Sequence, residues 1–183
     1  MPRYGYLREN PPPPGFTIIP IYPDTDPTAE LAAVDPASLQ RMSGPDDVSF
    51  NLAYSGRDLF ERARIRPARH EAPALLGVIP SPTGYRAIGV IFGGDRGPDH
   101  TADVNIEFSA AVHPDYRRTG IWRMLATRFV QDMEAVYGGE PGLSAKLEAY
   151  VINPATIPVL EELGFVNTAN PGEPRSPWYW KRL

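Results

Sequence analysis

The stretch from Val104 to Leu125 constrains the fold most, because its apolar residues change from a period of two to a period near 3.6. Its first half predicts a half-buried strand whose second face carries small polar groups and one carboxylate. The apolar or small positions are Val104, Ile106, Phe108, Ala110 and Val112, which alternate with Asp103, Asn105, Glu107, Ser109 and Ala111.

The second half of this stretch opens a helix, predicted from Ile121 to Val136 with one buried stripe. The stripe consists of Ile121, Leu125, Phe129, Met133 and Val136. Between strand and helix, Arg117, Arg118 and Gly120 form a basic turn at the helix N-terminus. Free backbone N–H groups, the positive end of the helix dipole and two guanidinium groups would together hold a diphosphate, and glycine lets a ligand approach the main chain. The pattern therefore predicts a cradle for an anionic phosphate group.

At this turn the sequence resembles the GCN5-related N-acetyltransferase (GNAT) family. The family signature is Arg or Gln, two residues, Gly, one residue, then Gly or Ala; Arg117 and Gly120 match it, whereas Trp122 stands at the normally small last position. The residues from Val112 to Arg117, VHPDYR, are similar to the family's V-x-P-x-Y-R lead-in. An indole that points into the core behind the helix would leave the cofactor pocket open, and one that points inward would partly fill it.

A second motif lies in residues 147–165. The apolar run 147–152 predicts a strand, which Asn153 interrupts, and a short helix is expected to start near Thr156 or Ile157 and to end before Gly164 as its C′ residue. Asn153 followed by a helix that ends in Leu-Gly-Phe resembles the GNAT family's pattern.

Other apolar runs bounded by Pro and Gly predict the remaining strands, at 16–22, 74–80, 85–92 and 177–183, the middle two forming a hairpin. Residues 26–42 are expected to form one or two short helices broken at Pro36. The resulting fold class is α/β (α+β), and the resemblance implies a GNAT-type mixed, mostly antiparallel sheet, splayed after its fourth strand, with helices on both faces. We expect one domain at 16–183, preceded by an extended Pro-rich arm at 1–15.

The resemblance also implies a co-substrate, acetyl-CoA or another acyl-CoA. The backbone of Ala111 and Val112 would pair with the pantetheine arm like an added strand, and Asn153 would lie near that arm. The cofactor's pyrophosphate would be held by the turn, which comprises Arg117, Arg118, Thr119, Gly120, Ile121 and Trp122.

Acetyl transfer to an amine requires a base for the amine proton and an acid for the leaving thiolate. Relatives often carry a carboxylate on the central strand, so Glu107 is the candidate base, with an ion-paired surface glutamate as the alternative; Ser109 would orient the acceptor or a water. Many relatives carry a tyrosine acid where this chain has Leu160. Tyr150 is the candidate substitute, with a packed strand tyrosine as the alternative. His113 is expected to cap its turn or to face solvent.

Composition excludes several other kinds of site. The chain has no cysteine, and none of its three histidines forms a metal-ligand spacing with another, so no metal is expected. A net charge of −4 gives no general reason for nucleic acid as partner. No apolar run approaches the roughly 20 residues of a membrane span, and the start lacks a signal-peptide core. The expected compartment is the cytoplasm, without membrane contact.

The sequence therefore predicts an acetyl-CoA-dependent N-acyltransferase that acetylates a primary amine, on a small molecule or peptide, by direct attack in a ternary complex. Two alternatives stay open. A GNAT-like binding or regulatory module without catalysis is suggested by Leu160 and Trp122. An enzyme modifying nucleic acid or a nucleotide is suggested by the Arg-rich residues 57–69 and the aromatic residues 178–180, although nucleic acid is not favoured. The acceptor segments, near 24–69 and 167–177, leave a homodimer open.

Overall fold

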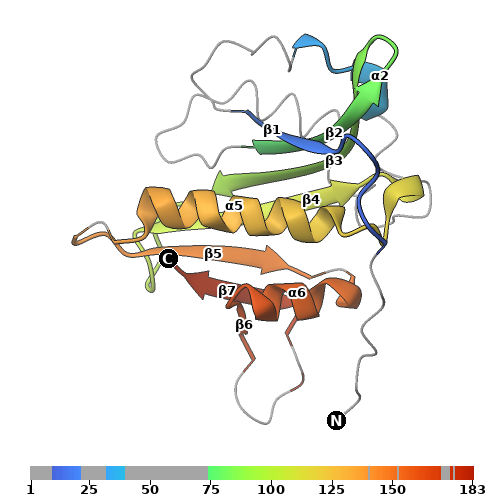
Figure 1. Cartoon of the computed structure of the whole chain (residues 1–183). Coiled ribbons are helices and arrows are strands. Elements are labelled where there is room, and N and C mark those ends of the chain that lie inside the picture. The colour runs from blue at the N-terminus through green and yellow to red at the C-terminus, as the bar shows by residue number, and fades with distance from the viewer. Residues whose placement is uncertain are drawn as a thin grey trace.

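A computed structural model describes residues 10–21, 32–39, 74–139, 141–151, 153–169, 174 and 176–183. These residues build one seven-stranded sheet with the order β1-β2-β3-β4-β5-β7-β6 (Figure 1). The strands are β1 (Thr17–Ile21), β2 (Ala74–Ser81), β3 (Gly84–Asp95), β4 (Val104–Val112), β5 (Ala145–Tyr150), β6 (Val166–Asn167) and β7 (Trp178–Arg182). The helices are α2 (Pro36–Leu39), α5 (Ile121–Tyr137) and α6 (Ile157–Glu162), with 3-10 turns at η1 (Pro114–Tyr116) and η2 (Pro154–Thr156).

The sheet is mixed and mostly antiparallel, as predicted. Strands β1 to β4 form an antiparallel meander, and β7 is antiparallel to both β5 and β6. Only β4 and β5 run parallel among the described strands, because helix α5 carries the chain back across the sheet between them. The sequence did not reveal β6, which has two residues and no alternation long enough to recognise.

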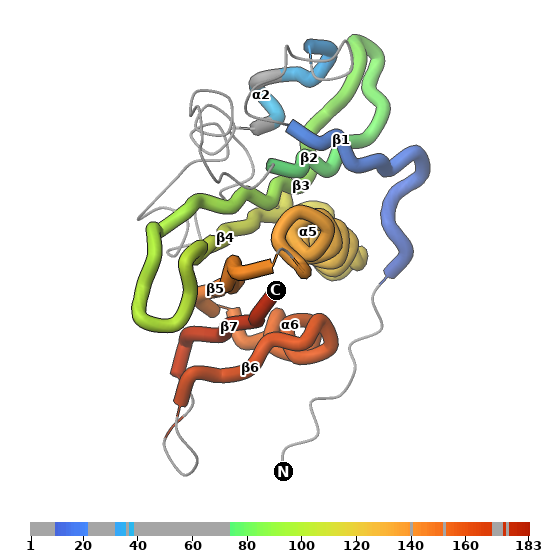
Figure 2. The backbone as a smooth tube through the Cα atoms, turned by 90° about the vertical axis from the view of Figure 1, so that its left-hand side faces the viewer, coloured from blue at the N-terminus to red at the C-terminus, as the bar shows by residue number. Residues whose placement is uncertain are grey.

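Helices α5 and α6 lie on the same side of the sheet (Figure 2). The core between them and the sheet includes Leu125, Phe129 and Leu160, all fully buried. On the opposite face, Leu76 and Val90 pack with Val34, the residue that leads into α2. Apolar side chains therefore pack on both faces of the sheet.

Several local predictions differ from the structure in detail. Helix α5 buries Tyr137, whereas Val136, which was predicted in the buried stripe, is 57% exposed. Tyr137 is four residues after Met133 and therefore lies closer to the same helix face than Val136, which is three residues after it. Pro36 begins α2 instead of breaking a helix, a position where its missing N–H costs nothing. Strand β5 begins and ends two residues earlier than predicted. The Arg-rich segment 57–69 lies outside the described residues.

The sheet splays after its fourth strand, as predicted. Pairing of β4 with β5 ends at Phe108↔Ala149, whereas β4 continues along β3 to Val112↔Gly89. Strand β5 instead follows β7, through Tyr150↔Trp178 and a hydrogen bond from Val151 N–H to Pro177 O. A gap therefore opens between the C-terminal ends of β4 and β5, the end of the molecule where α5 and α6 begin (Figure 1).

Candidate functional site

The backbone of β4 presents hydrogen-bonding groups to the gap. His113 N–H donates to Ile88 O of β3 at 2.9 Å, so the carbonyl of Val112, in the same planar peptide, points away from β3. Alternation along the strand then directs the backbone groups of Ala110 and Val112 toward the gap and those of Ala111 toward β3. The gap-facing groups are thus those of Ala110 and Val112.

The turn after β4 is held by its own side chains. His113 is 5% exposed, and its Nδ1 accepts a hydrogen bond from Asp115 N–H at 3.3 Å. Its ring also meets Tyr116 edge-on, with centroids 5.6 Å apart. Of the two predicted alternatives, capping of the turn is confirmed, and the imidazole packs beneath the turn that it caps.

The basic turn itself adopts two left-handed conformations. Arg118 has φ 63° and Gly120, the N-cap of α5, has φ 72°. Arg117 Nε donates to Val112 O at 3.2 Å, which ties the turn to the end of β4. Thr119 Oγ1 donates to Tyr116 O, closing the preceding loop. Both arginines are exposed, so their charges lie at the surface beside the gap.

The start of α5 is suited to an anion. Its first turn contains no acidic residue, and Gly120 has no side chain that could cap it. The N–H groups of a first helical turn have no acceptor within the helix, and the dipole is positive there. Trp122 is partly buried and packs against the core cluster that α5 shares with the sheet.

Asn153 lies at the other border of the gap, after β5. Its Oδ1 accepts from Ala155 N–H at 3.0 Å, so the side chain caps η2 just before α6. An ion pair between Arg123 and Glu162 joins the first turn of α5 to α6. The turn after β4 and the residues after β5 therefore meet at one end of the molecule.

Glu107 and Ser109 project from the face of β4 opposite α5. Glu107 Oε2 lies 2.6 Å from Arg96 Nε, and its side chain is 23% exposed. The register places Glu107 beside Glu148 of β5. The structure therefore shows an ion-paired glutamate on the polar face, near but not inside the gap.

Tyr150 is the last residue of β5 and is 49% exposed. Its ring meets Trp178 of β7 edge-on, with centroids 5.0 Å apart. Leu160, which stands where the family resemblance implies a tyrosine acid, is 1% exposed in the core. Tyr179 is buried in the same core, whereas Trp178 and Trp180 alternate onto the other face.

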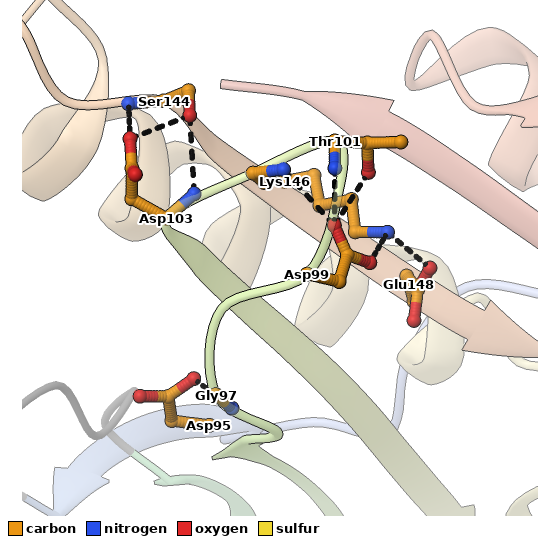
Figure 3. A network of polar contacts seen from close by, with 9 residues as sticks. Asp95, Gly97, Asp99, Thr101, Asp103, Ser144, Lys146 and Glu148 are labelled. Carbon is orange, nitrogen blue, oxygen red and sulfur yellow. Dashed lines mark hydrogen bonds and ion pairs between the residues drawn. The ribbon is translucent and has the colours of Figure 1, made fainter.

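A polar network, missed from the sequence, borders this face (Figure 3). Lys146 Nζ donates to Asp99 at 2.5 Å and to Glu148 at 2.8 Å, and Ser144 donates to Asp103. Burial disfavours the charged ammonium, but these hydrogen bonds outweigh it and raise the pKa of Lys146. The hydrogen bond from Lys146 holds the pKa of Asp99 well below its usual range, and those from Ser144 lower the pKa of Asp103. The alternation of Lys146 with Leu147 and of Glu148 with Ala149 was the one available signal.

No protein-family model matches the sequence. None of the curated proteins matches it either. Solved structures do share its architecture. AtaTR bound with acetyl-CoA matches with a TM-score of 0.58 and 13% identity, over 92% of this chain and 93% of that one. The chain has the fold of the GCN5-related N-acetyltransferases.

Two further structures with the GNAT fold match over nearly the whole chain. The KacTA–DNA complex gives a TM-score of 0.55 at 15% identity, over 91% of this chain and 92% of that one. The NatC complex bound to Gag peptide and CoA gives 0.52 at 17% identity, over 92% and 98%. The fold predicted from the two motifs is therefore confirmed.

The described residues contain neither a metal-binding cluster nor a helix suited to crossing a membrane. No group of three or more His, Cys, Asp or Glu side chains in these ranges is arranged to hold a metal ion. The helices of this part of the chain also fall short of the length and apolar character that a membrane crossing requires.

Proposed function

We propose that this protein is an acetyl-CoA-dependent N-acyltransferase that acetylates a primary amine by direct attack in a ternary complex. The gap that opens beyond Phe108↔Ala149 is the main support for this proposal. It is bordered by the outward-facing backbone of Val112 and by the start of α5, which is basic and has no side-chain cap. An extended thioester arm and a diphosphate are the two ligand parts that such a gap and such a helix start would bind.

In this proposal the cofactor's pantetheine arm pairs with the gap-facing groups of Ala110 and Val112. Ala111 lies between them on the same strand segment, and Asn153 borders the arm from the β5 side. The pyrophosphate is bound by the turn, whose members are Arg117, Arg118, Thr119, Gly120, Ile121 and Trp122. Packing of Trp122 against the core supports this arrangement, because an indole held there leaves the approach to the main chain open.

The acceptor amine approaches from the polar sheet face. Its nitrogen attacks the thioester carbonyl carbon, the C–S bond breaks, and the amine gives up one proton. Glu107 takes that proton, directly or through a water that Ser109 orients. Tyr150 donates its hydroxyl proton to the leaving thiolate; its 49% exposure and position at the end of β5 support this role. The acceptor is a small molecule or a peptide amine.

A binding module without catalysis is the second candidate, favoured by one observation. Leu160 is 1% exposed in the core, so that position supplies no acid and Tyr150 would have to replace it. Transfer of the acetyl group to any amine in a broad screen would exclude this candidate. Binding of acetyl-CoA with no turnover would support it.

Calorimetry with acetyl-CoA tests the binding half of the proposal. We expect saturable binding by the wild-type protein, and an affinity about tenfold weaker for Arg118→Ala, because a charge-assisted contact to the diphosphate is lost. Arg128→Ala is the matched control: Arg128 is an exposed arginine of α5 that pairs with Asp132 at 2.8 Å, further along the helix. Absence of wild-type binding at millimolar ligand would refute the proposed function.

A further inference from the structure

The N-terminal arm, residues 10–15, contacts the basic turn that borders the gap. Asn10 N–H donates to the carbonyl oxygen of Arg118 at 2.9 Å. Figure 1 shows the arm in dark blue, running from β1 along the end of the molecule where α5 begins. A segment predicted only as an extended leader therefore touches the residues proposed to bind the cofactor's pyrophosphate.

The arm is anchored at its other end, which limits its freedom to leave the turn. Phe16 N–H donates to Pro13 O at 3.1 Å, and Gly15, with φ 75°, lies so close to Pro80 that a Cβ atom there would meet the proline ring at 2.8 Å. Phe16 packs over Gly77 and against the core. Four consecutive prolines, 11–14, restrict the backbone between the two contacts. Holding Asn10 in place thus costs little conformational entropy.

The contact falls on the most constrained residue of the turn. Arg118 is the one non-glycine residue of the described chain with a positive φ, a conformation that costs roughly 1–2 kcal/mol and persists only where neighbouring contacts enforce it. Because the peptide unit is planar and trans, fixing the Arg118 carbonyl also fixes the direction of Thr119 N–H, which points away from the arm. One hydrogen bond therefore sets the orientation of a turn donor.

We propose that the arm positions the pyrophosphate-binding turn: the hydrogen bond from Asn10 N–H holds Arg118 in its left-handed conformation, and so preorganises the donors of residues 118–120 for the diphosphate of the cofactor. This inference rests on the proposed function. A turn already held in its binding conformation pays less ordering cost when the ligand arrives. Asn10 acts through Arg118 and is a positioning residue.

Two substitutions at one position separate the backbone donor from the side chain. Asn10→Pro removes the N–H, and the residue before Pro11 already favours the extended conformations that proline also adopts. Asn10→Ala keeps the N–H and is the matched control. We expect Asn10→Pro to weaken acetyl-CoA binding about fivefold and to raise its KM with kcat unchanged, and Asn10→Ala to remain within about twofold of wild type. Equal affinities in all three proteins, or equal losses in both variants, would overturn the inference.

A second experiment tests the same contact through Arg118. Glycine adopts a positive φ without cost, so Arg118→Gly removes the need for an external restraint. The effect of Asn10→Pro on affinity should therefore shrink to about twofold or less in the Arg118→Gly background. An undiminished fivefold effect would show that the arm acts in some other way.

Amide hydrogen exchange of the ligand-free protein distinguishes failure of this inference from failure of the proposed function. We expect faster exchange at residues 117–121 in Asn10→Pro than in Asn10→Ala, whether or not acetyl-CoA is the ligand. If wild type does not bind acetyl-CoA, the proposed function fails while this measurement still decides the contact. If exchange at the turn is the same in both variants, the arm does not order it.

Discussion

Glu107 projects from the polar face of the sheet, where it is paired with Arg96. Arg96, its partner at 2.6 Å, has a side chain that is 62% exposed, so water screens the pair and its net stabilisation is small, about 1 kcal/mol or less. Such a partner can be displaced when an acceptor arrives. The same carboxylate is next to Glu148 in register, and Glu148 is itself paired with Lys146 Nζ at 2.8 Å, so each carboxylate of this strip has a cation beside it.

Glu107→Gln tests the base at this position. The amide keeps the shape of the side chain but cannot take a proton, so kcat should fall about 100-fold with the best acceptor from an amine screen. The Kd for acetyl-CoA should stay within about twofold, because the residue lies outside the gap. Glu134→Gln is the matched control, a glutamate of α5 that pairs with Lys181 at 2.7 Å. A kcat within threefold of wild type in Glu107→Gln would assign the base to another group.

At the scale of elements, the strand, turn and helix from Val104 to Tyr137 form the unit that positions the proposed cofactor site. The turn joins a strand end that faces a gap to a helix start that carries no acid. The left-handed conformations of Arg118 and Gly120 allow this short connection, since they reverse the chain within a few residues. The geometry of the turn should therefore matter for binding as much as any one of its side chains.

Gly120→Ala tests that geometry. Alanine at φ 72° is strained by roughly 1–2 kcal/mol, and the helix start would shift to relieve it. We expect a lower thermal midpoint and an acetyl-CoA affinity weakened about tenfold, measured by calorimetry. Gly139→Ala is the control, because Gly139 has φ 96° and open space around it at the opposite end of α5. It should lose comparable stability and keep its affinity; equal effects on affinity would mean that general destabilisation, not the turn, weakens binding.

How much the sequence could predict depends on how local each signal was. The bounds of β4 and the first residue of α5 followed from periodicity, because both patterns are read within a few neighbouring positions. Three contacts could not be predicted from the sequence, since each joins segments that only the folded chain brings together. They are the pairing of Glu107 with Arg96, the network of Lys146 and the contact of Asn10 with Arg118. For His113 the sequence left capping and solvent exposure open, because its burial depends on packing against Tyr116 and the rest of the folded turn.

At the scale of the whole molecule, the sheet consists of two halves that share one parallel junction. The meander β1–β4 and the group β5–β7 are joined by the pairing of β4 with β5 and by helix α5. The loop between β3 and β4 reinforces this junction, because Asp99 reaches Lys146 and Asp103 reaches Ser144, both at β5 or just before it (Figure 3). The gap that we propose as the cofactor site opens at the far end of the same junction, so this network joins the two halves at the end opposite the gap.

The pKa shifts in this network predict how stability depends on pH. Asp99 and Asp103 have lowered pKa values in the folded protein, so their contribution is complete above the usual value of 3.8 and is lost as the pH falls toward the folded values. The pKa of Lys146 is raised, so its contribution is complete below its usual 10.5 and is lost as the pH rises through the folded value. Stability should therefore decline below about pH 4 and above about pH 10.5.

Lys146→Met tests whether this network causes the acid decline. The ammonium group is nearly buried, with 9% of the side chain exposed, so its loss should reduce the free energy of unfolding by about 2 kcal/mol at pH 7 in urea titrations. Without its partner Asp99 returns toward its usual pKa, and the variant should lose less stability than wild type between pH 7 and pH 3. Lys181→Met, which removes an 18% exposed lysine paired with Glu134 on α5, should keep the wild-type acid profile. An acid loss in Lys146→Met as large as that of wild type would show that carboxylates outside this network govern the response.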